Sequence, residues 1–310
     1  MPSSRRQFLQ SSFAVPLLGL AARSLPARAD ADAASEAFPD WRAFDRATLD
    51  RAYNNSAAVP ESAALFKDWL ARSAAFRASH AEHLDLAYGP RARNRIDYYS
   101  AGANTPVLVF IHGGYWQMRS KDDFAFLAEP FLPLGISVAM VGYPLGPDAP
   151  MDTIVADARA ALRYLAGAVG ALGGDPQRMV LSGWSSGGHL ATMALNEVPV
   201  RGGIAISGLF DLEPLLGSYL NDKLKMDLAV AQRNSPLLQL PARSAPLALF
   251  SGGSELAELR RQSRQFSTAR AQAGLPTELS MVAGANHYTI LNALLDRDGM
   301  IQRKVLALVA

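Results

Sequence analysis

The sequence of 310 residues contains no cysteine. This absence excludes a thiol nucleophile, a thiolate-bound zinc or iron–sulfur site and any disulfide, so stability must come from the hydrophobic core. Histidine is also scarce: there are 5 in the whole chain, scattered too widely to suggest a set of metal ligands. The length and the hydrophobic content of 49% are sufficient for one large α/β domain.

The first residues have the features of an export signal rather than of a fold. Ser4-Arg5-Arg6-Gln7-Phe8-Leu9 is typical of a twin-arginine motif, and an apolar stretch follows at 13–22. That stretch is too short for a membrane span, and Ala27-Arg28-Ala29 after it is a small-residue cleavage pattern. We therefore expect a signal peptide over 1–29, recognised by the twin-arginine export machinery, and a periplasmic or secreted chain that begins at Asp30.

Without this leader, the sign of the formal net charge changes. The whole chain has 30 basic and 28 acidic residues, which gives +2. The basic residues before Asp30 are Arg5, Arg6, Arg23 and Arg28. Removing these 4 leaves 26 basic against 28 acidic residues, a balance of −2. Nothing in this balance suggests a polyanion, so we expect no nucleic-acid partner.

Short apolar segments alternate with helical patterns along most of the chain. The segments predicted as strands are 84–88, 95–99, 107–111, 136–141, 179–181, 203–207, 247–250 and 278–282, and helices are expected at 151–169 and 300–309. Apolar strands separated by helices are typical of a parallel sheet buried on both faces. The fold class is therefore α/β, with a mostly parallel eight-stranded sheet and helices on both faces.

The N-terminal part of the remaining chain has a helical pattern instead. Residues 30–82 are alanine-rich, and aromatic residues at helical spacing predict one helix around 41–53 and another around 64–76. We expect a helical extension packed on a main domain that spans 83–310.

Residues 211–241 interrupt the strand–helix alternation. Two short helical segments are expected there, at 212–220 and 224–230. An insertion at this point lies on the carboxyl side of the sheet, where open α/β sheets bind ligands. It is a candidate lid or pocket wall.

Gly183-Trp184-Ser185-Ser186-Gly187 is the most informative motif of the chain. It fits G-x-S-x-G, with an apolar strand before it and a helical segment after it, which is the context of a nucleophile elbow. Glycine on both sides allows the strained turn that exposes the serine hydroxyl at the sheet edge. Ser185 is therefore the candidate nucleophile.

A serine nucleophile needs a histidine to take its proton. His80 and His83 lie before or at the first strand, and His189 lies on the helix after the elbow, where a structural role is expected. His112 opens a glycine pair and is expected to brace that loop. His287 follows the last strand, where the base of such a site belongs in chain order, so it is the candidate base.

The histidine in turn needs a carboxylate to orient it. Glu255 lies just after the predicted strand 247–250 and is the first choice. Asp211, after the preceding strand, and Glu258, one helical turn beyond Glu255, are the alternatives that the sequence leaves open.

Backbone N–H groups are required to stabilise an oxyanion. His112-Gly113-Gly114-Tyr115-Trp116 follows the strand 107–111, and glycine there lets the backbone approach a substrate. We expect the N–H groups of Gly113, Gly114 and Ser186 to form the oxyanion hole.

These motifs together resemble an α/β-hydrolase fold serine esterase of the kynurenine formamidase (arylformamidase) type, near the hormone-sensitive-lipase-like esterases. The resemblance rests on His112-Gly113-Gly114-Tyr115-Trp116, on the elbow, on Glu255 through Ser263, on Asn286-His287 and on the segment Tyr53-Asn54-Asn55. It implies a catalytic triad of Ser185, Glu255 and His287, a small-molecule ester or formamide substrate, and neither a metal nor a cofactor.

The expected reaction is hydrolysis of a small-acyl ester or an aryl formamide through an acyl-enzyme. Tyr115, Trp116 and Trp184 either crowd the acyl side of a substrate pocket or pack beneath the sheet edge. Substrates left open are an aryl formamide, a short-chain ester and an aromatic ester. The alternative function is a catalytically silent scaffold of the same fold that acts as a binding protein.

Overall fold

The computed structural model describes residues 38–310, and the predicted leader at 1–29 lies outside them. Export of the chain therefore stays a prediction. Among the described residues, no helix combines the length and the apolar character that crossing a bilayer requires.

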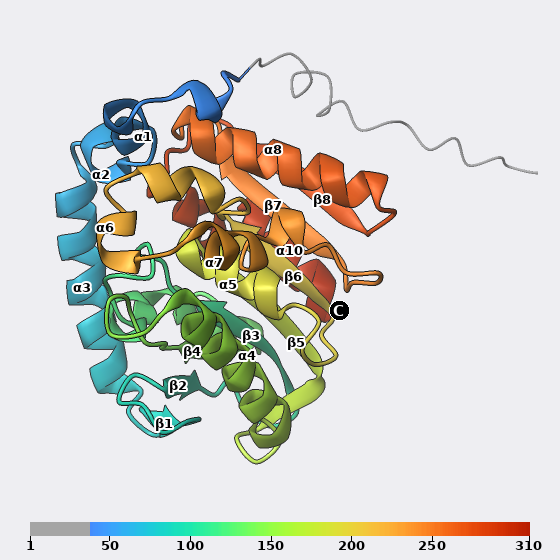
Figure 1. Ribbon diagram of the computed structural model, residues 1–310. Helices are drawn as coiled ribbons and strands as arrows, with labels where there is room; N and C mark the ends of the chain where they lie inside the picture. The colour runs from blue at the N-terminus through green and yellow to red at the C-terminus, as the bar shows by residue number, and fades with distance from the viewer. Residues whose placement is uncertain (1–37) are drawn as a thin grey trace, which may run out of the picture. The chain divides into compact units, whose positions relative to one another are not determined.

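The predicted α/β fold with an eight-stranded sheet is confirmed (Figure 1). The strands are β1 (Leu86–Ala87), β2 (Arg95–Tyr99), β3 (Thr105–Ile111), β4 (Ser137–Val141), β5 (Gly174–Trp184), β6 (Gly202–Ile206), β7 (Leu247–Gly252) and β8 (Thr277–Val282), in the spatial order β1-β2-β4-β3-β5-β6-β7-β8. β1 and β2 pair antiparallel with their neighbours, and all pairs from β4 to β8 are parallel. The strand order reverses at β3, between β4 and β5, so a crevice is expected at the carboxyl ends of β3 and β5.

Helices cover both faces of the sheet. The α-helices are α1 (Arg46–Ala52), α2 (Asn55–Ala58), α3 (Ser62–Ser79), α4 (Met151–Ala168), α5 (Ser186–Ala194), α6 (Asn221–Leu224), α7 (Leu228–Arg233), α8 (Ala257–Gln272), α9 (Asn292–Leu295) and α10 (Met300–Val309). The 3-10 helices are η1 (Trp41–Ala43), η2 (Lys121–Ala128), η3 (Leu132–Leu134), η4 (Glu213–Gly217), η5 (Pro236–Leu238) and η6 (Thr289–Leu291).

The alternation of side chains along the strands divides the core into two layers. Val107, Val109 and Ile111 of β3 pack with α4 and α5, whereas Leu108 and Phe110 face the layer formed by α3, η2 and α10. Because both sets are almost completely buried, the strand is apolar throughout, which is why its sequence shows no polar alternation.

Of the two helices predicted before the sheet, the first is divided into shorter elements and the second is formed as one long helix. The stripe predicted as one helix over 41–53 is divided into η1 and α1, because the Asp45 carboxylate accepts a hydrogen bond of 2.8 Å from the Thr48 N–H and begins a new helix there. The second predicted helix is α3. Its Trp69 is buried and stacks on Phe126 of η2, so this helix belongs to the core.

The segment 84–88 is shorter as a strand than its sequence predicts. Only Leu86 and Ala87 pair with β2. Asp85 has a left-handed backbone with φ 57°, and its N–H donates to the Asp97 carboxylate at 2.8 Å instead of continuing a ladder. The local backbone conformation therefore ends the strand.

The insertion at 211–241 contains η4, α6, α7 and η5, close to the helical segments expected there. It is fixed to the N-terminal helices: the Tyr219 N–H donates to the Asp50 carboxylate at 2.6 Å, and Arg46 pairs with Asp222 at 2.7 Å. Its position beside α1 and α2 is visible in Figure 1. Movement of this segment as a lid stays a prediction.

The turn between β5 and α5 packs directly against β3. A Cβ added at Gly187 would overlap the carbonyl oxygen of Ile111, and one at Gly183 would overlap the carbonyl of Gly187. Only glycine allows this approach of one backbone to another.

Replacing Gly187 with alanine is expected to reduce the free energy of unfolding by about 3 kcal/mol or more, because the backbone of β3 must move. Gly167→Ala is the matched control. Gly167 is exposed in α4 and a Cβ there meets no atom within 4 Å, so alanine should stabilise the protein by about 0.5–1 kcal/mol. Urea titration measures both changes, and equal stabilities of the two variants would contradict this account of the turn.

Candidate active site

Ser185 occupies the turn between β5 and α5 in a conformation that is rare for a residue with a side chain. Its backbone has φ 59° and ψ −125°, and its N–H donates to the Ile206 carbonyl at 2.8 Å. This strained geometry is typical of functional positions and presents the hydroxyl at the carboxyl edge of the sheet.

The structure brings three predicted site residues together at this edge. His287 Nε2 lies 3.0 Å from Ser185 Oγ, and His287 Nδ1 lies 3.4 Å from Glu255 Oε2. All three residues are at most 5% exposed. The histidine backbone is fixed by Trp184, whose indole N–H donates to the His287 carbonyl at 2.8 Å. The arrangement allows a proton to pass from the serine to the imidazole while the carboxylate orients the ring.

The second oxygen of the Glu255 carboxylate, Oε1, is also hydrogen-bonded. Glu255 Oε1 accepts hydrogen bonds from the Ser207 hydroxyl and from the Gly252 N–H, the latter at 2.7 Å. Ser207 was not among the site residues predicted from the sequence. The signal that could have revealed it is its place as the first polar residue after the apolar strand β6.

The two alternative carboxylates, Glu258 and Asp211, contact groups other than His287. Glu258 forms a buried ion pair with Arg261, at 2.8 Å between Oε2 and Nη2. The Asp211 carboxylate accepts from the Glu213 N–H at 3.1 Å, and burial raises its pKa. Among the described residues, Glu255 is therefore the carboxylate within hydrogen-bonding distance of His287.

The glycine pair after β3 lies directly beside the serine turn. A Cβ on Gly113 would come within 3.0 Å of Ser185 Cβ, and Gly114 has φ 122° and lines the cavity above Ser185. The N–H groups of both glycines donate to no acceptor within the described part of the chain. Ser186 is the first residue of α5, so its N–H has no partner inside the helix. Gly113 and Ser186 border the serine without lining the cavity.

His112 braces this loop, as the sequence leads us to expect. Its Nδ1 lies 2.7 Å from the Gly113 carbonyl, and its ring stacks on Tyr143 with centroids 4.3 Å apart. The Tyr143 hydroxyl donates to the His112 carbonyl at 2.9 Å. Burial lowers the pKa of His112 to about 3, so its imidazole is neutral at physiological pH.

His189 connects the loop after β3 to the insertion. Its Nδ1 accepts a hydrogen bond from the Trp116 indole N–H at 3.2 Å, and its Nε2 lies 2.7 Å from the Asn234 carbonyl. The indole is a donor only, so the ring must carry its proton on Nε2. Burial lowers the pKa of His189 to about 4, and both ring nitrogens are occupied.

The hydroxyl of Ser185 faces a cavity of about 90 Å³. Its lining comes from the N-terminal helices, the loop after β3, the insertion and the turn of the base: Asn55, Ser56, Phe66, Gly114, Tyr115, Gln117, Met118, Arg119, Trp184, Ser185, Tyr219, Leu220, His287 and Tyr288. The predicted pocket residues Tyr115 and Trp184 are among them. The residues of the N-terminal helices and of the insertion are separated from the motifs by long stretches of chain, although the sequence already offers 211–241 as a candidate pocket wall.

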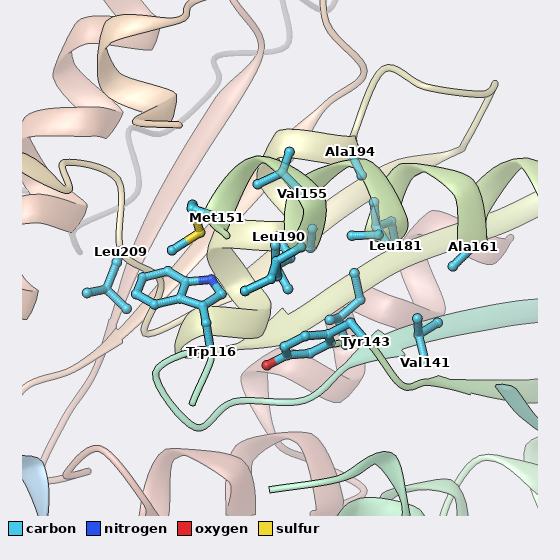
Figure 2. Close-up of a cluster of buried hydrophobic side chains, with 14 of the residues drawn as sticks. Trp116, Val141, Tyr143, Met151, Val155, Ala161, Leu181, Leu190, Ala194 and Leu209 are labelled. Carbon is cyan, nitrogen blue, oxygen red and sulfur yellow. The ribbon is translucent and has the colours of Figure 1, made fainter. Parts of the chain in front are cut away.

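Trp116, which the sequence places with Tyr115 and Trp184, does not line this cavity. Figure 2 shows its ring among apolar side chains that include Met151, Leu190 and Leu209. Its left-handed backbone, with φ 58°, turns the ring into the core, where it is completely buried. In this structure Trp116 therefore anchors the loop after β3 in the core and lies outside the lining of the cavity.

One cluster of carboxylates has the spacing of a cation site. Asp85, Asp97 and Asp122 converge on one side of β2. The Lys121 ammonium lies 2.6 Å from Asp85 Oδ1 and from Asp97 Oδ1 and 2.7 Å from Asp122 Oδ1, and Arg77 also pairs with Asp97. Lys121 and Arg77 supply the positive charge that the three carboxylates require, so the cluster is an ion-pair network.

Sequence comparison identifies related hydrolases. A family model described as BD-FAE matches residues 97–198. The kynurenine formamidase of Danio rerio is 31% identical over 73% of this chain and 81% of its own length, and that of Salmo salar is 31% identical over 69% and 78%. The isoprenylcysteine alpha-carbonyl methylesterase ICME of Arabidopsis thaliana is 27% identical over 65% of this chain and 55% of its own.

Solved structures have the same architecture. A putative thioesterase from Silicibacter sp. tm1040 superposes with a TM-score of 0.74 at 29% identity and covers 84% of this chain and 99% of its own. A hyperthermophilic esterase from Pyrobaculum calidifontis gives a TM-score of 0.64 at 18% identity over 78% of this chain and 90% of its own. At 18% identity, the similarity to the Pyrobaculum calidifontis esterase shows a shared fold and nothing more.

The neutral, buried His189 predicts how stability depends on pH. In the unfolded chain its pKa returns to the ordinary 6.5, so below that pH unfolding takes up a proton that the folded protein, with a pKa of about 4, does not bind. Stability should therefore fall as pH decreases from 6.5 towards 4, and His189 should contribute up to about 1.4 kcal/mol per pH unit.

His189→Gln keeps one donor and one acceptor but does not titrate. Urea unfolding at several pH values should give this variant a shallower fall of stability between pH 6.5 and 4 than the original protein shows. Parallel profiles would contradict the assignment of a neutral imidazole at this position.

Proposed function

The chain belongs to the kynurenine formamidase family and is a hydrolase of the α/β-hydrolase fold, and we propose that it cleaves aryl formamides or small-acyl esters through an acyl-enzyme on Ser185. The observation that carries this proposal is the contact of Ser185 Oγ with His287 Nε2, at 3.0 Å, at the floor of a cavity. Glu255 on the opposite ring nitrogen supports it.

In the first step His287 Nε2 takes the proton of the Ser185 hydroxyl while Oγ attacks the carbonyl carbon of the substrate. The carbonyl oxygen becomes an oxyanion. It accepts hydrogen bonds from the backbone N–H groups of Gly113, Gly114 and Ser186. Ser186 is also the first residue of α5, and the N-terminus of a helix favours negative charge. The Glu255 carboxylate stabilises the protonated imidazole.

In the second step the bond to the leaving group breaks. The protonated His287 gives its proton to the departing arylamine nitrogen or alcohol oxygen, and the acyl group stays on Ser185. Water, deprotonated by His287, then attacks the acyl-enzyme and releases the carboxylic acid. Serine and histidine return to their initial states, so the cycle is balanced without a cofactor.

The bulky side chains that line the cavity favour a small acyl group. Trp184, His287 and Tyr288 line it together with Ser185 and leave little room for a long acyl chain, so formyl or acetyl is favoured. Tyr115, Trp184 and Tyr288 supply aromatic walls against which an aryl leaving group can pack. The related kynurenine formamidases point in the same direction, so N-formylkynurenine and short p-nitrophenyl esters are the substrates to compare.

Turnover of these substrates by the chain from Asp30 onward tests the proposal. We expect hydrolysis of N-formylkynurenine or of p-nitrophenyl acetate, with p-nitrophenyl octanoate slower than the acetate because the cavity is narrow. Ser185→Ala should lower kcat/KM by about 1000-fold or more without changing the thermal unfolding temperature greatly.

A fluorophosphonate probe separates this proposal from a silent scaffold. The probe should label the folded protein and fail to label Ser185→Ala. Absence of labelling in the original protein, together with no turnover, would favour the binding-protein alternative.

Exchange of the carboxylates tests the role of Glu255. Glu255→Gln keeps the shape but removes the charge that stabilises protonated His287, so kcat should fall by about 100-fold or more. Asp211→Asn is the matched control, because Asp211 is a buried carboxylate near the same sheet edge without contact to His287. A larger loss in Asp211→Asn than in Glu255→Gln would contradict the assignment.

A further inference from the structure

One residue that lines the cavity has a buried polar atom without a partner among the described residues. The side-chain oxygen Oδ1 of Asn55 has no hydrogen bond within the described part of the chain, although the residue is only 4% exposed. Asn55 begins α2 and lines the same cavity as Ser185. Buried amide oxygens almost always accept a hydrogen bond, so an unpaired one at a binding cavity is a candidate for a contact with the ligand.

The orientation of this amide follows from its neighbour. The Tyr115 hydroxyl donates its one proton to the Tyr53 carbonyl at 2.7 Å. Towards Asn55, 2.9 Å away, it can therefore only accept, which requires the NH₂ group of Asn55 on that side. Exchange of the nitrogen and the oxygen would place two acceptors against each other. Oδ1 is thus the atom that remains unpaired.

Tyr53 and Tyr115, which fix the orientation of the Asn55 amide, are themselves fixed by burial and hydrogen bonds. Tyr53 is completely buried, and its hydroxyl donates to Glu258 Oε2 at 3.1 Å and accepts from Gln262 at 3.0 Å. The Tyr115 ring is 9% exposed and lies on the loop that follows β3. Asn55 is therefore positioned before a substrate binds, which lowers the cost of using its oxygen as an acceptor.

We propose that Asn55 Oδ1 accepts a hydrogen bond from the N–H of a secondary formamide bound over Ser185, and so makes the site prefer formamides to esters of the same shape. This inference rests on the proposed function. An ester has oxygen in place of that N–H and leaves Oδ1 unpaired in the complex. Sites built to hydrogen-bond a substrate N–H or O–H discriminate strongly against analogues that lack it.

The matched substrates formanilide and phenyl formate test the inference, since both transfer a formyl group and differ in the N–H. In Asn55→Leu, kcat/KM for formanilide should fall about 10-fold or more, whereas that for phenyl formate should stay within about 3-fold or rise. Because each substrate is compared with itself in the two proteins, their different chemical reactivities cancel.

Tyr115→Phe is the second variant. It removes the hydroxyl that fixes the amide, so the side chain of Asn55 is free to turn, and a smaller loss confined to formanilide is expected. Asn54→Ala is the control: Asn54 caps the same helix through the Ala57 N–H at 3.0 Å and does not line the cavity, so the ratio of the two substrates should not change. Thermal melting establishes that each variant is folded.

The outcomes separate the inference from the function beneath it. If the original protein hydrolyses neither substrate, the proposed function is wrong. If it hydrolyses phenyl formate but not formanilide, or if folded Asn55→Leu loses both activities equally, the function stands and the role of Asn55 is wrong. An ordered water on Oδ1 that persists with a bound formamide analogue would also overturn it.

Discussion

The left-handed backbone of Ser185 is the constraint on which the site depends. A residue with a side chain at φ 59° costs about 1–3 kcal/mol, so the surrounding structure must hold it there. β6 does so through the hydrogen bond from the Ser185 N–H to Ile206, and β3 does so through the close contact of Gly187 with Ile111. Two strands, β3 and β6, thus fix the turn that follows β5, and the serine lies where the strand order reverses.

The N-terminal helices are part of this site because a buried polar network joins them to the sheet. Gln262 of α8 accepts from the Phe210 and Asp211 N–H groups and donates to the Tyr53 hydroxyl. The same helix follows the loop that carries Glu255. Displacing the N-terminal helices would leave these groups unpaired in the interior, which is costly, so the network holds these helices against α8.

The sequence predicts what depends on chain order and periodicity, and it fails where a distant contact decides. The apolar strands could be placed because segments buried on both faces have no polar alternation, and their order brings Ser185 and His287 to one edge. The sequence alone could not decide between Glu255 and Glu258 as the carboxylate that orients the histidine. The structure decides because Glu258 is paired with Arg261. The orientation of Asn55 depends on a tyrosine 60 residues away, which no local pattern records.

The three histidines around the site differ in the groups that contact their ring nitrogens. His112 and His189 are enclosed, with a pKa lowered by burial. His112 Nδ1 meets a backbone carbonyl, and the two ring nitrogens of His189 meet an indole and a backbone carbonyl. No carboxylate is hydrogen-bonded to either ring among the described residues, so a positive charge on them has nothing to stabilise it. His287 has a carboxylate on one nitrogen and a hydroxyl on the other. The proposed base must carry a proton for part of the cycle, and of these three rings His287 is the one with a carboxylate beside it to stabilise that charge.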